Sequence, residues 1–418
     1  MIKNVMYFGL FFLFSANSIS IILFGVRLPI FIGLLIFFSI VIGIYGFLDL
    51  KNRNWYGIRE NYIAKGTRYY VLFMILWLIY AALSFFWQRD FAGWMMAINF
   101  LVIGNFCAFL FPFFLKSRQD VFRTYGILGI SVLAHNLIGW FEVITRIYLF
   151  PSLKDAAGWD GRPVSVFYNT NNFSVFLFFG VFILCANFQT TQNKVVKSIW
   201  FLGMLSSILL IFLTGSRGGL LTLGIGGCIF VFLRYFDYIK RGIGYLWKRK
   251  AILFVTAILV VIVLGAGYFA FYQIFFTGER ATSGISRVNL INNGVMFLGI
   301  TYGRGVGAGN IEFWVRNYWG YFTYGIVNMH NWWFEILTAY GVVIFLLYLV
   351  FYVKLSTSSF MRYVKEKDSG LRAVHMANLC ILGGFIVAST IPSSIMPVVW
   401  FWAFMGVLIG VQKECIYE

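Results

Sequence analysis

The sequence is short of charge and of the residues that most metal and disulfide sites use. Only 11% of its 418 residues are charged, whereas soluble domains carry about 25%. It has three His and five Cys, without any CxxC or Cys/His spacing typical of a zinc site or a disulfide framework. Acidic residues number 15, and no DxD pair that could hold a divalent metal with a nucleotide sugar occurs outside the membrane. We therefore expect neither a metal nor a cofactor.

Apolar residues make up 61% of the chain, aromatic residues 21%, and the mean hydropathy is +0.82. A soluble protein must keep a wetted surface, so this composition excludes a soluble domain, a disordered chain and a coiled coil. It predicts an all-α, polytopic membrane protein. The chain begins Met-Ile-Lys and turns apolar with no small-residue cleavage site, which indicates an uncleaved first span and not a signal peptide.

About 20 apolar residues in helical form cross a bilayer core. Runs of this kind occur about twelve times, in what we treat as a single transmembrane domain (residues 1–418). The predicted spans are Val5–Val26, Pro29–Leu50, Tyr69–Trp87, Gly93–Leu115, Tyr125–Phe150, Asn172–Phe188, Ser198–Thr214, Gly219–Phe236, Ala251–Tyr272, Asn331–Val353, Ala373–Ile391 and Ile395–Val411.

The net charge of +18 is mostly a topology signal, because cytoplasmic loops collect Lys and Arg. With both termini in the cytoplasm, 23 of the 33 basic residues fall inside and nine outside. Eight of those nine are Arg, whose planar fork grips phosphate or carboxylate in two places. This bias predicts an anionic ligand outside; the alternative is small-number variation among membrane-surface anchors. Nucleic acid is not expected as a partner.

A long external loop, residues 273–330, dominates the outside and is predicted to carry short helices and the catalytic site. Arg287 precedes an apolar stretch, Val288–Ile300, which we expect to lie as a helix in the interface. Arg304 lies in the run Gly303–Asn310, which resembles a phosphate-cradling loop without its Lys-Ser/Thr ending.

Two further motifs sit where spans meet the outside. In Thr214-Gly215-Ser216-Arg217-Gly218-Gly219 we expect a tight hairpin that holds Arg217 at a helix N-terminus, where anions are favoured. The alternative is an Arg that only anchors at the surface. His330 and Asn331 begin the tenth span, and Glu335 follows. His330 is a candidate proton acceptor or phosphate ligand; the alternative is a polar cap above an aromatic belt.

The fifth span and the segment after it carry the remaining candidates. His135, Glu142 and Arg146 share one helical stripe, and Glu142 and Arg146 can pair; such buried charge predicts either function or a structural ion pair. Arg162, with Asn171 and Asn172 at the start of the sixth span, can donate to sugar hydroxyls or phosphate.

Taken in order, these residues resemble the O-antigen ligase and O-antigen polymerase superfamily. Arg162 and the Asn-containing span start look like its F-x-N-x-N segment, and Ser216–Leu221 is similar to its S/T-R-G/A-x-L segment. Arg287 followed by Gly305-Val306-Gly307 resembles a third segment, and His330-Asn331 with Gly341 a fourth. The resemblance covers roughly residues 162–353. The chain departs from the pattern at Ala339-Tyr340, where the family often has an acidic and a small residue.

The resemblance implies a GT-C-like glycosyltransferase, inverting and metal-independent, in the bacterial cytoplasmic membrane with its active site outside. It would join undecaprenyl-diphosphate-linked repeat units into a capsule, exopolysaccharide or O-antigen chain, beside a flippase and a chain-length regulator. The alternatives are a ligase that passes glycan to lipid A core or another acceptor, and a flippase for the lipid-linked sugar. The expected catalytic residues are His330, Arg217 and Arg287. The expected substrate-binding residues are Arg162, Arg304, Asn171, Asn172, Asn331 and Glu142.

Overall fold

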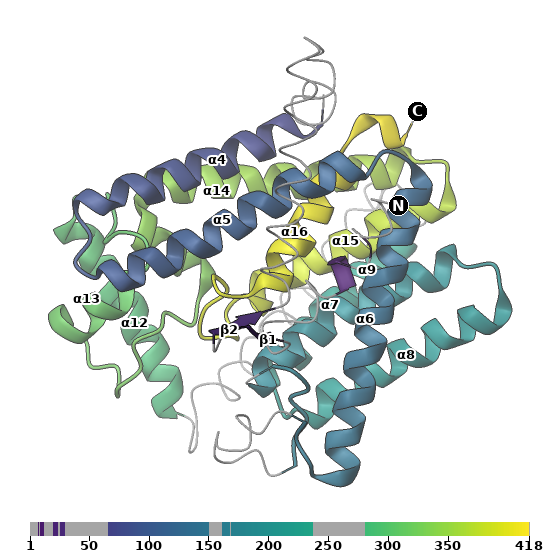
Figure 1. The fold of residues 1–418 in the computed structure, drawn as a ribbon, viewed down its shortest axis with the longest axis horizontal. Helices are drawn as coiled ribbons and strands as arrows, with labels where there is room; N and C mark the ends of the chain where they lie inside the picture. The colour runs from purple at the N-terminus through teal and green to yellow at the C-terminus, as the bar shows by residue number, and fades with distance from the viewer. Residues whose placement is uncertain are drawn as a thin grey trace, which may run out of the picture.

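The computed structural model describes residues 7, 9–11, 20–23, 26–29, 66–149, 161–167, 169–236 and 281–417, which form a bundle of apolar helices (Figure 1). The elements are β1 (Ser20–Leu23), β2 (Val26–Pro29), α4 (Arg68–Leu83), η1 (Ser84–Phe86), α5 (Phe91–Phe114), α6 (Arg118–Thr145), α7 (Thr170–Thr190), α8 (Lys194–Leu213), α9 (Arg217–Arg234), α12 (Ala281–Ile300), α13 (Ile311–Tyr318), α14 (Trp332–Lys365), α15 (Ser369–Ala388), α16 (Val399–Val411) and η4 (Glu414–Ile416).

Eight of the helices in these described ranges are long and apolar enough to cross a membrane, and α16 is a shorter apolar helix of 13 residues. They match nine of the twelve predicted spans, which confirms a polytopic α-helical membrane protein. Of the other three, Pro29–Leu50 and Ala251–Tyr272 lie almost wholly outside the described residues, as does most of Val5–Val26.

The first predicted span is wrong at its C-terminal part. Ser20–Leu23 and Val26–Pro29 are antiparallel strands, with Ser20 opposite Pro29 and Leu23 opposite Val26. The β-branched residues in both segments favour extended backbone, and the two residues between them in sequence include a Gly, which is the spacing of a tight hairpin.

The helices begin at polar residues whose side chains accept backbone N–H groups, the usual way of satisfying the free amides of a first turn. These caps explain why the helices start a few residues from the ends of the hydrophobic runs. The capping residues are Asp90, Ser117, Asn169, Asn193, Ser216, Asn331 and Asp368.

Helix α7 lies at the centre and packs against α6, α8, α9 and α15; 15 of its 21 residues are buried. The outer helices instead expose apolar stripes at intervals of three and four residues. On α8 the stripe is Leu202, Leu205, Leu209 and Phe212, and on α14 it is Val343, Leu346, Val350 and Val353. A stripe of this kind is typical of a helix face turned toward lipid.

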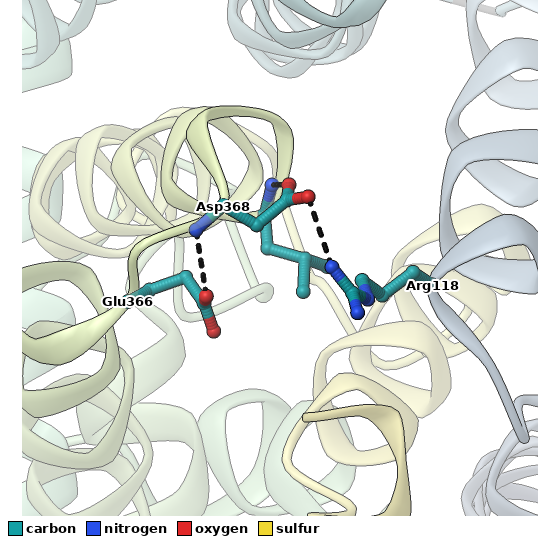
Figure 2. Close-up of polar contacts among 4 residues, drawn as sticks. Arg118, Glu366 and Asp368 are labelled. Carbon is teal, nitrogen blue, oxygen red and sulfur yellow. Dashed lines mark hydrogen bonds and ion pairs between the residues drawn. The ribbon is translucent and has the colours of Figure 1, made fainter. Parts of the chain in front are cut away.

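The chain alternates between two ends of the bundle, as the predicted topology requires. At one end Arg118, the first residue of α6, forms an ion pair with Asp368 at the start of α15. Glu366 accepts a hydrogen bond from the Asp368 amide (Figure 2). Helices α12 and α13 lie at the other end, away from the C-terminus (Figure 1). By the predicted topology the α12–α13 end faces outside, and we call it the external end.

Candidate active site

The centre of the external end is the loop between α15 and α16, residues 389–398, which we call the α15–α16 loop. Its backbone carbonyls accept hydrogen bonds from three distant positions. The Ser393 carbonyl accepts from the His330 amide at 3.1 Å, and the Ser389 carbonyl from the Trp332 amide at 3.1 Å. The Thr390 carbonyl accepts from Nη1 of Arg287 at 3.3 Å. The loop therefore fixes both His330 and Arg287.

His330 is held in an unusual conformation directly before α14. Its φ of 48° is in the left-handed region, which residues other than Gly rarely adopt, so the flanking hydrogen bonds must hold it. Its Nδ1 atom is buried and has no hydrogen-bond partner among the described residues. Burial, and then the charge of Arg287, lower the pKa of His330 to about 4, although a hydrogen bond to the Ile391 backbone opposes the shift. The imidazole is therefore neutral at pH 7.

Arg287 lies in the second turn of α12, because that helix begins at Ala281. The prediction that the helix starts after Arg287 is therefore wrong. The earlier residues, Ala281-Thr282-Ser283-Gly284, are polar or small and carry no apolar periodicity, so the sequence pattern missed the first turns. Burial lowers the pKa of Arg287. Its guanidinium donates to a neutral carbonyl, and it makes no ion pair with a carboxylate in the described ranges.

Arg217 is the first residue of α9, as predicted, and Ser216 caps the helix by accepting the Gly219 amide. The next residue, Gly218, packs so tightly on the α15–α16 loop that a Cβ there would lie 2.7 Å from the Ile391 side chain. The hairpin is thus pressed against the same loop that holds His330 and Arg287. The structure thus brings His330 and Arg287 to one loop, and packs Gly218, the residue after Arg217, against the same loop.

Two of the predicted binding residues join this hairpin. Oδ1 of Asn171 accepts a hydrogen bond from the Ser216 hydroxyl at 2.9 Å. The Arg162 guanidinium lies over Gly215, where a Cβ would be 3.4 Å from its Nη1. Asn172 instead lines a small cavity of about 180 Å³ beside Ser393 and Ser394 of the α15–α16 loop.

Three other predicted residues have different surroundings. The Asn331 side chain caps α14 by accepting the Trp333 and Phe334 amides, so its local role is structural. Glu142 is fully buried, and its Oε2 accepts the Val164 and Ser165 amides at 2.8 and 2.7 Å. This carboxylate anchors the segment before α7 in place of the expected pairing with Arg146, and we leave Glu142 out of the proposed site.

Arg304 lies apart from the Arg287 cluster, with its guanidinium 4.8 Å from the centre of the Trp87 ring. The two residues line a separate cavity of about 510 Å³ together with Arg89 and Trp314. The structure thus does not bring Arg304 to the α15–α16 loop.

The glycine run after α12 is not a phosphate cradle, because its amides already have partners. The Val306 and Gly307 amides donate to the Thr338 and Ala339 carbonyls of α14, and the Val342 amide donates to the Gly303 carbonyl. These α14 groups are available because Gly341 breaks the helix with φ 77° and ψ 179°. The glycines of the run 303–309 and Gly341 of α14 therefore allow the two backbone segments to approach each other closely.

Glu335 stands out in the structure more than in the sequence. Its Oε1 accepts a hydrogen bond from the Ser394 hydroxyl at 2.6 Å, while its buried Oε2 has no partner in the described part of the chain. Its place shortly after His330 in the sequence did not predict this contact with the α15–α16 loop. Pro392, Pro397 and two Ser between apolar helices were the available signal for a structured loop.

Comparison with known proteins finds the same region. Residues 202–349 match the family described as O-antigen ligase. The match includes Arg217, Arg287 and His330 but not Arg162, Asn171 or Asn172. Over 365 residues the chain is 27% identical to the teichuronic acid biosynthesis protein TuaE of Bacillus subtilis (strain 168), covering 85% of this chain and 72% of that protein.

Proposed function

We propose that this chain is a polysaccharide polymerase, because residues 202–349 match the O-antigen ligase family and the chain is similar to a teichuronic acid biosynthesis protein. In this proposal it joins repeat units carried on undecaprenyl diphosphate at the outer face of the cytoplasmic membrane. The observation that carries the proposal is the attachment of Arg287 and His330 to the α15–α16 loop, against which the start of α9, with Arg217, is packed through Gly218.

Glycosyl transfer from a lipid diphosphate requires cations beside the leaving group and a neutral base beside the acceptor hydroxyl. In the transfer, an acceptor hydroxyl oxygen forms a bond to the anomeric carbon, and the bond from that carbon to the diphosphate oxygen breaks with its electrons on the diphosphate. Arg217 and Arg287 would stabilise the charge that develops there, with Arg162 beside the hairpin. His330, neutral at pH 7, would take the hydroxyl proton on Nδ1.

The site alone does not distinguish a polymerase from a ligase, which would use the same groups on another acceptor. The relative is named for teichuronic acid biosynthesis, which favours synthesis of a polymer over transfer to lipid A core. A flippase is disfavoured because the converging cations lie at one end of the bundle and not at mid-depth.

The proposal is tested with purified protein in liposomes whose lipid-linked repeat units are already on the accessible face. A polymerase lengthens the glycan under these conditions, whereas a flippase leaves the glycan length unchanged. Single Arg217→Ala, Arg287→Ala and His330→Ala variants should each lose lengthening. Full activity in all three variants would exclude the site, and transfer of one unit to a different acceptor without lengthening would identify a ligase.

A further inference from the structure

A second cavity, of about 400 Å³, shares Ser393, Ser394 and Pro397 of the α15–α16 loop with the smaller cavity that Asn172 lines. It lies between the start of α5, the start of α13 and the first two turns of α14, and its volume is in the range of small-molecule sites. Its polar wall includes the side chains of Asp90, Asn328, Glu312, Glu335, Ser393 and Ser394. We call it the carboxylate cavity.

We propose that the carboxylate cavity binds the terminal sugar of the acceptor glycan, and that Glu335 accepts a hydrogen bond from one of its hydroxyl groups. The inference rests on the proposed function, since it assigns the acceptor side of the same reaction.

The first argument is the state of Glu335. Ser394 fixes one carboxylate oxygen at 2.6 Å, while Oε2 is buried and has no partner among the described residues. A buried polar atom without a hydrogen bond is costly, and Glu335 is among the residues that line the cavity, so a hydroxyl donor bound there would relieve that cost. A sugar hydroxyl is a donor of this kind.

The second argument is charge. The acidic residues on this wall disfavour a diphosphate, whereas the half-buried, positively charged Arg287, which does not line the cavity, favours one. A neutral, hydroxyl-rich ligand fits the same wall without repulsion. Two of the carboxylates already have partners, because Asp90 caps α5 and Glu312 pairs with Arg316 at 3.3 Å. Glu335 also has one partner, Ser394, but of the three it is the one with a buried oxygen that has no hydrogen bond among the described residues.

The third argument is position. The Ser393 carbonyl binds the His330 amide, and the neighbouring Ser394 hydroxyl binds Glu335. The candidate base and the free carboxylate oxygen are thus attached to consecutive residues of one loop. A hydroxyl held by Glu335 would enter beside His330, and its proton would pass to the imidazole as its oxygen bonds to the anomeric carbon.

The decisive variant is Glu335→Gln, which retains an oxygen for the Ser394 hydroxyl but replaces the other acceptor with an NH₂ donor. The probe is the repeat-unit oligosaccharide released from its lipid by mild acid, and its binding to the full-length protein in detergent is measured by calorimetry. We expect Glu335→Gln to weaken this binding by about tenfold and to leave the binding of sugar-free undecaprenyl diphosphate unchanged. Arg287→Ala should do the reverse.

Two further variants make the test independent of any folding defect. Ala92→Trp places a large side chain at an exposed position on the cavity wall, and should also remove oligosaccharide binding. Glu366→Gln, a carboxylate at the opposite end of the bundle, is the matched control and should change neither affinity. If Glu335→Gln and Ala92→Trp bind the oligosaccharide like the parent while Arg287→Ala loses activity, the acceptor site is wrong and the polymerase stands. If the arginine variants are also fully active, the polymerase site fails as well.

Discussion

The two ends of the helical bundle use their cations differently. At the end opposite the candidate site, Arg118 pairs with Asp368 at 3.2 Å (Figure 2), and Arg362 donates to the Gln412 carbonyl at 2.7 Å while lying 3.8 Å above the Tyr417 ring. At the external end, Arg162 and Arg287 make no ion pair with any carboxylate of the described residues. Arg118 and Arg362 connect helices at the first end, whereas Arg162 and Arg287 at the second have donors available for an anion, although Arg316 there pairs with Glu312.

The largest difference in activity should appear when one Arg at each end is replaced by Ala. We expect Arg287→Ala to lower the rate of glycan lengthening by about 10²–10³, the usual cost of losing one electrostatic donor to a leaving group. Arg118→Ala, which breaks a surface ion pair, should stay within about twofold, since such pairs contribute little. Initial rates with purified lipid-linked repeats measure both. Equal losses in the two variants would remove the distinction between the ends.

The second prediction sharpens the comparison through pH. His330 must be unprotonated to accept a proton, and its pKa of about 4 lies below the ordinary 6.5. Activity should therefore be level from about pH 7 down to about pH 5 and fall as the pH approaches 4. In Arg287→Gln the neighbouring positive charge is gone, so the pKa of His330 rises and the residual activity should fall at higher pH.

Burial is the larger cause of the His330 shift, so the movement in Arg287→Gln should be partial. Rate profiles of the parent and the variant, taken at one ionic strength, measure it. An acid limb near pH 6.5 in the parent would contradict the buried site. An unchanged limb in the variant would separate His330 from Arg287.

The membrane-spanning helices and the position of Arg217 at a helix start could be predicted from the sequence. Apolar length predicted the spans, and the glycine-rich hairpin predicted Arg217 at a helix N-terminus. The contacts that complete the site did not follow, because they use backbone atoms. The Arg287 guanidinium binds the Thr390 carbonyl, and any residue type could supply that carbonyl.

Helical spacing was also misleading at Glu142. Arg146 is four residues away, yet one carboxylate oxygen of Glu142, Oε2, accepts the Val164 and Ser165 amides, 22 and 23 residues later. The glycine run was similarly ambiguous. Glycines that approach a phosphate and glycines that approach a kinked helix have the same residue pattern, and only the partners of the Val306 and Gly307 amides distinguish them.

The third prediction concerns the end that stabilises the fold. Arg362→Ala removes a hydrogen bond to the Gln412 carbonyl and a cation over the Tyr417 ring. We expect it to lower the free energy of unfolding by about 1–3 kcal/mol and to leave the rate per folded molecule unchanged. Thermal denaturation in detergent, with rates normalised to folded protein, checks it. A variant that is fully stable but slow would give this end a direct part in catalysis.

The smallest effect should be at Arg304, the external Arg that the structure separates from the others. Its guanidinium lies over Trp87 in a different cavity, so Arg304→Ala should lose a surface cation–π contact of about 0.5–1 kcal/mol and slow lengthening by no more than about fivefold. Arg287→Ala in the same assay is the reference. A loss as large as that of Arg287→Ala would mean that the diphosphate reaches both cavities, and that position at the external end matters more than contact with the α15–α16 loop.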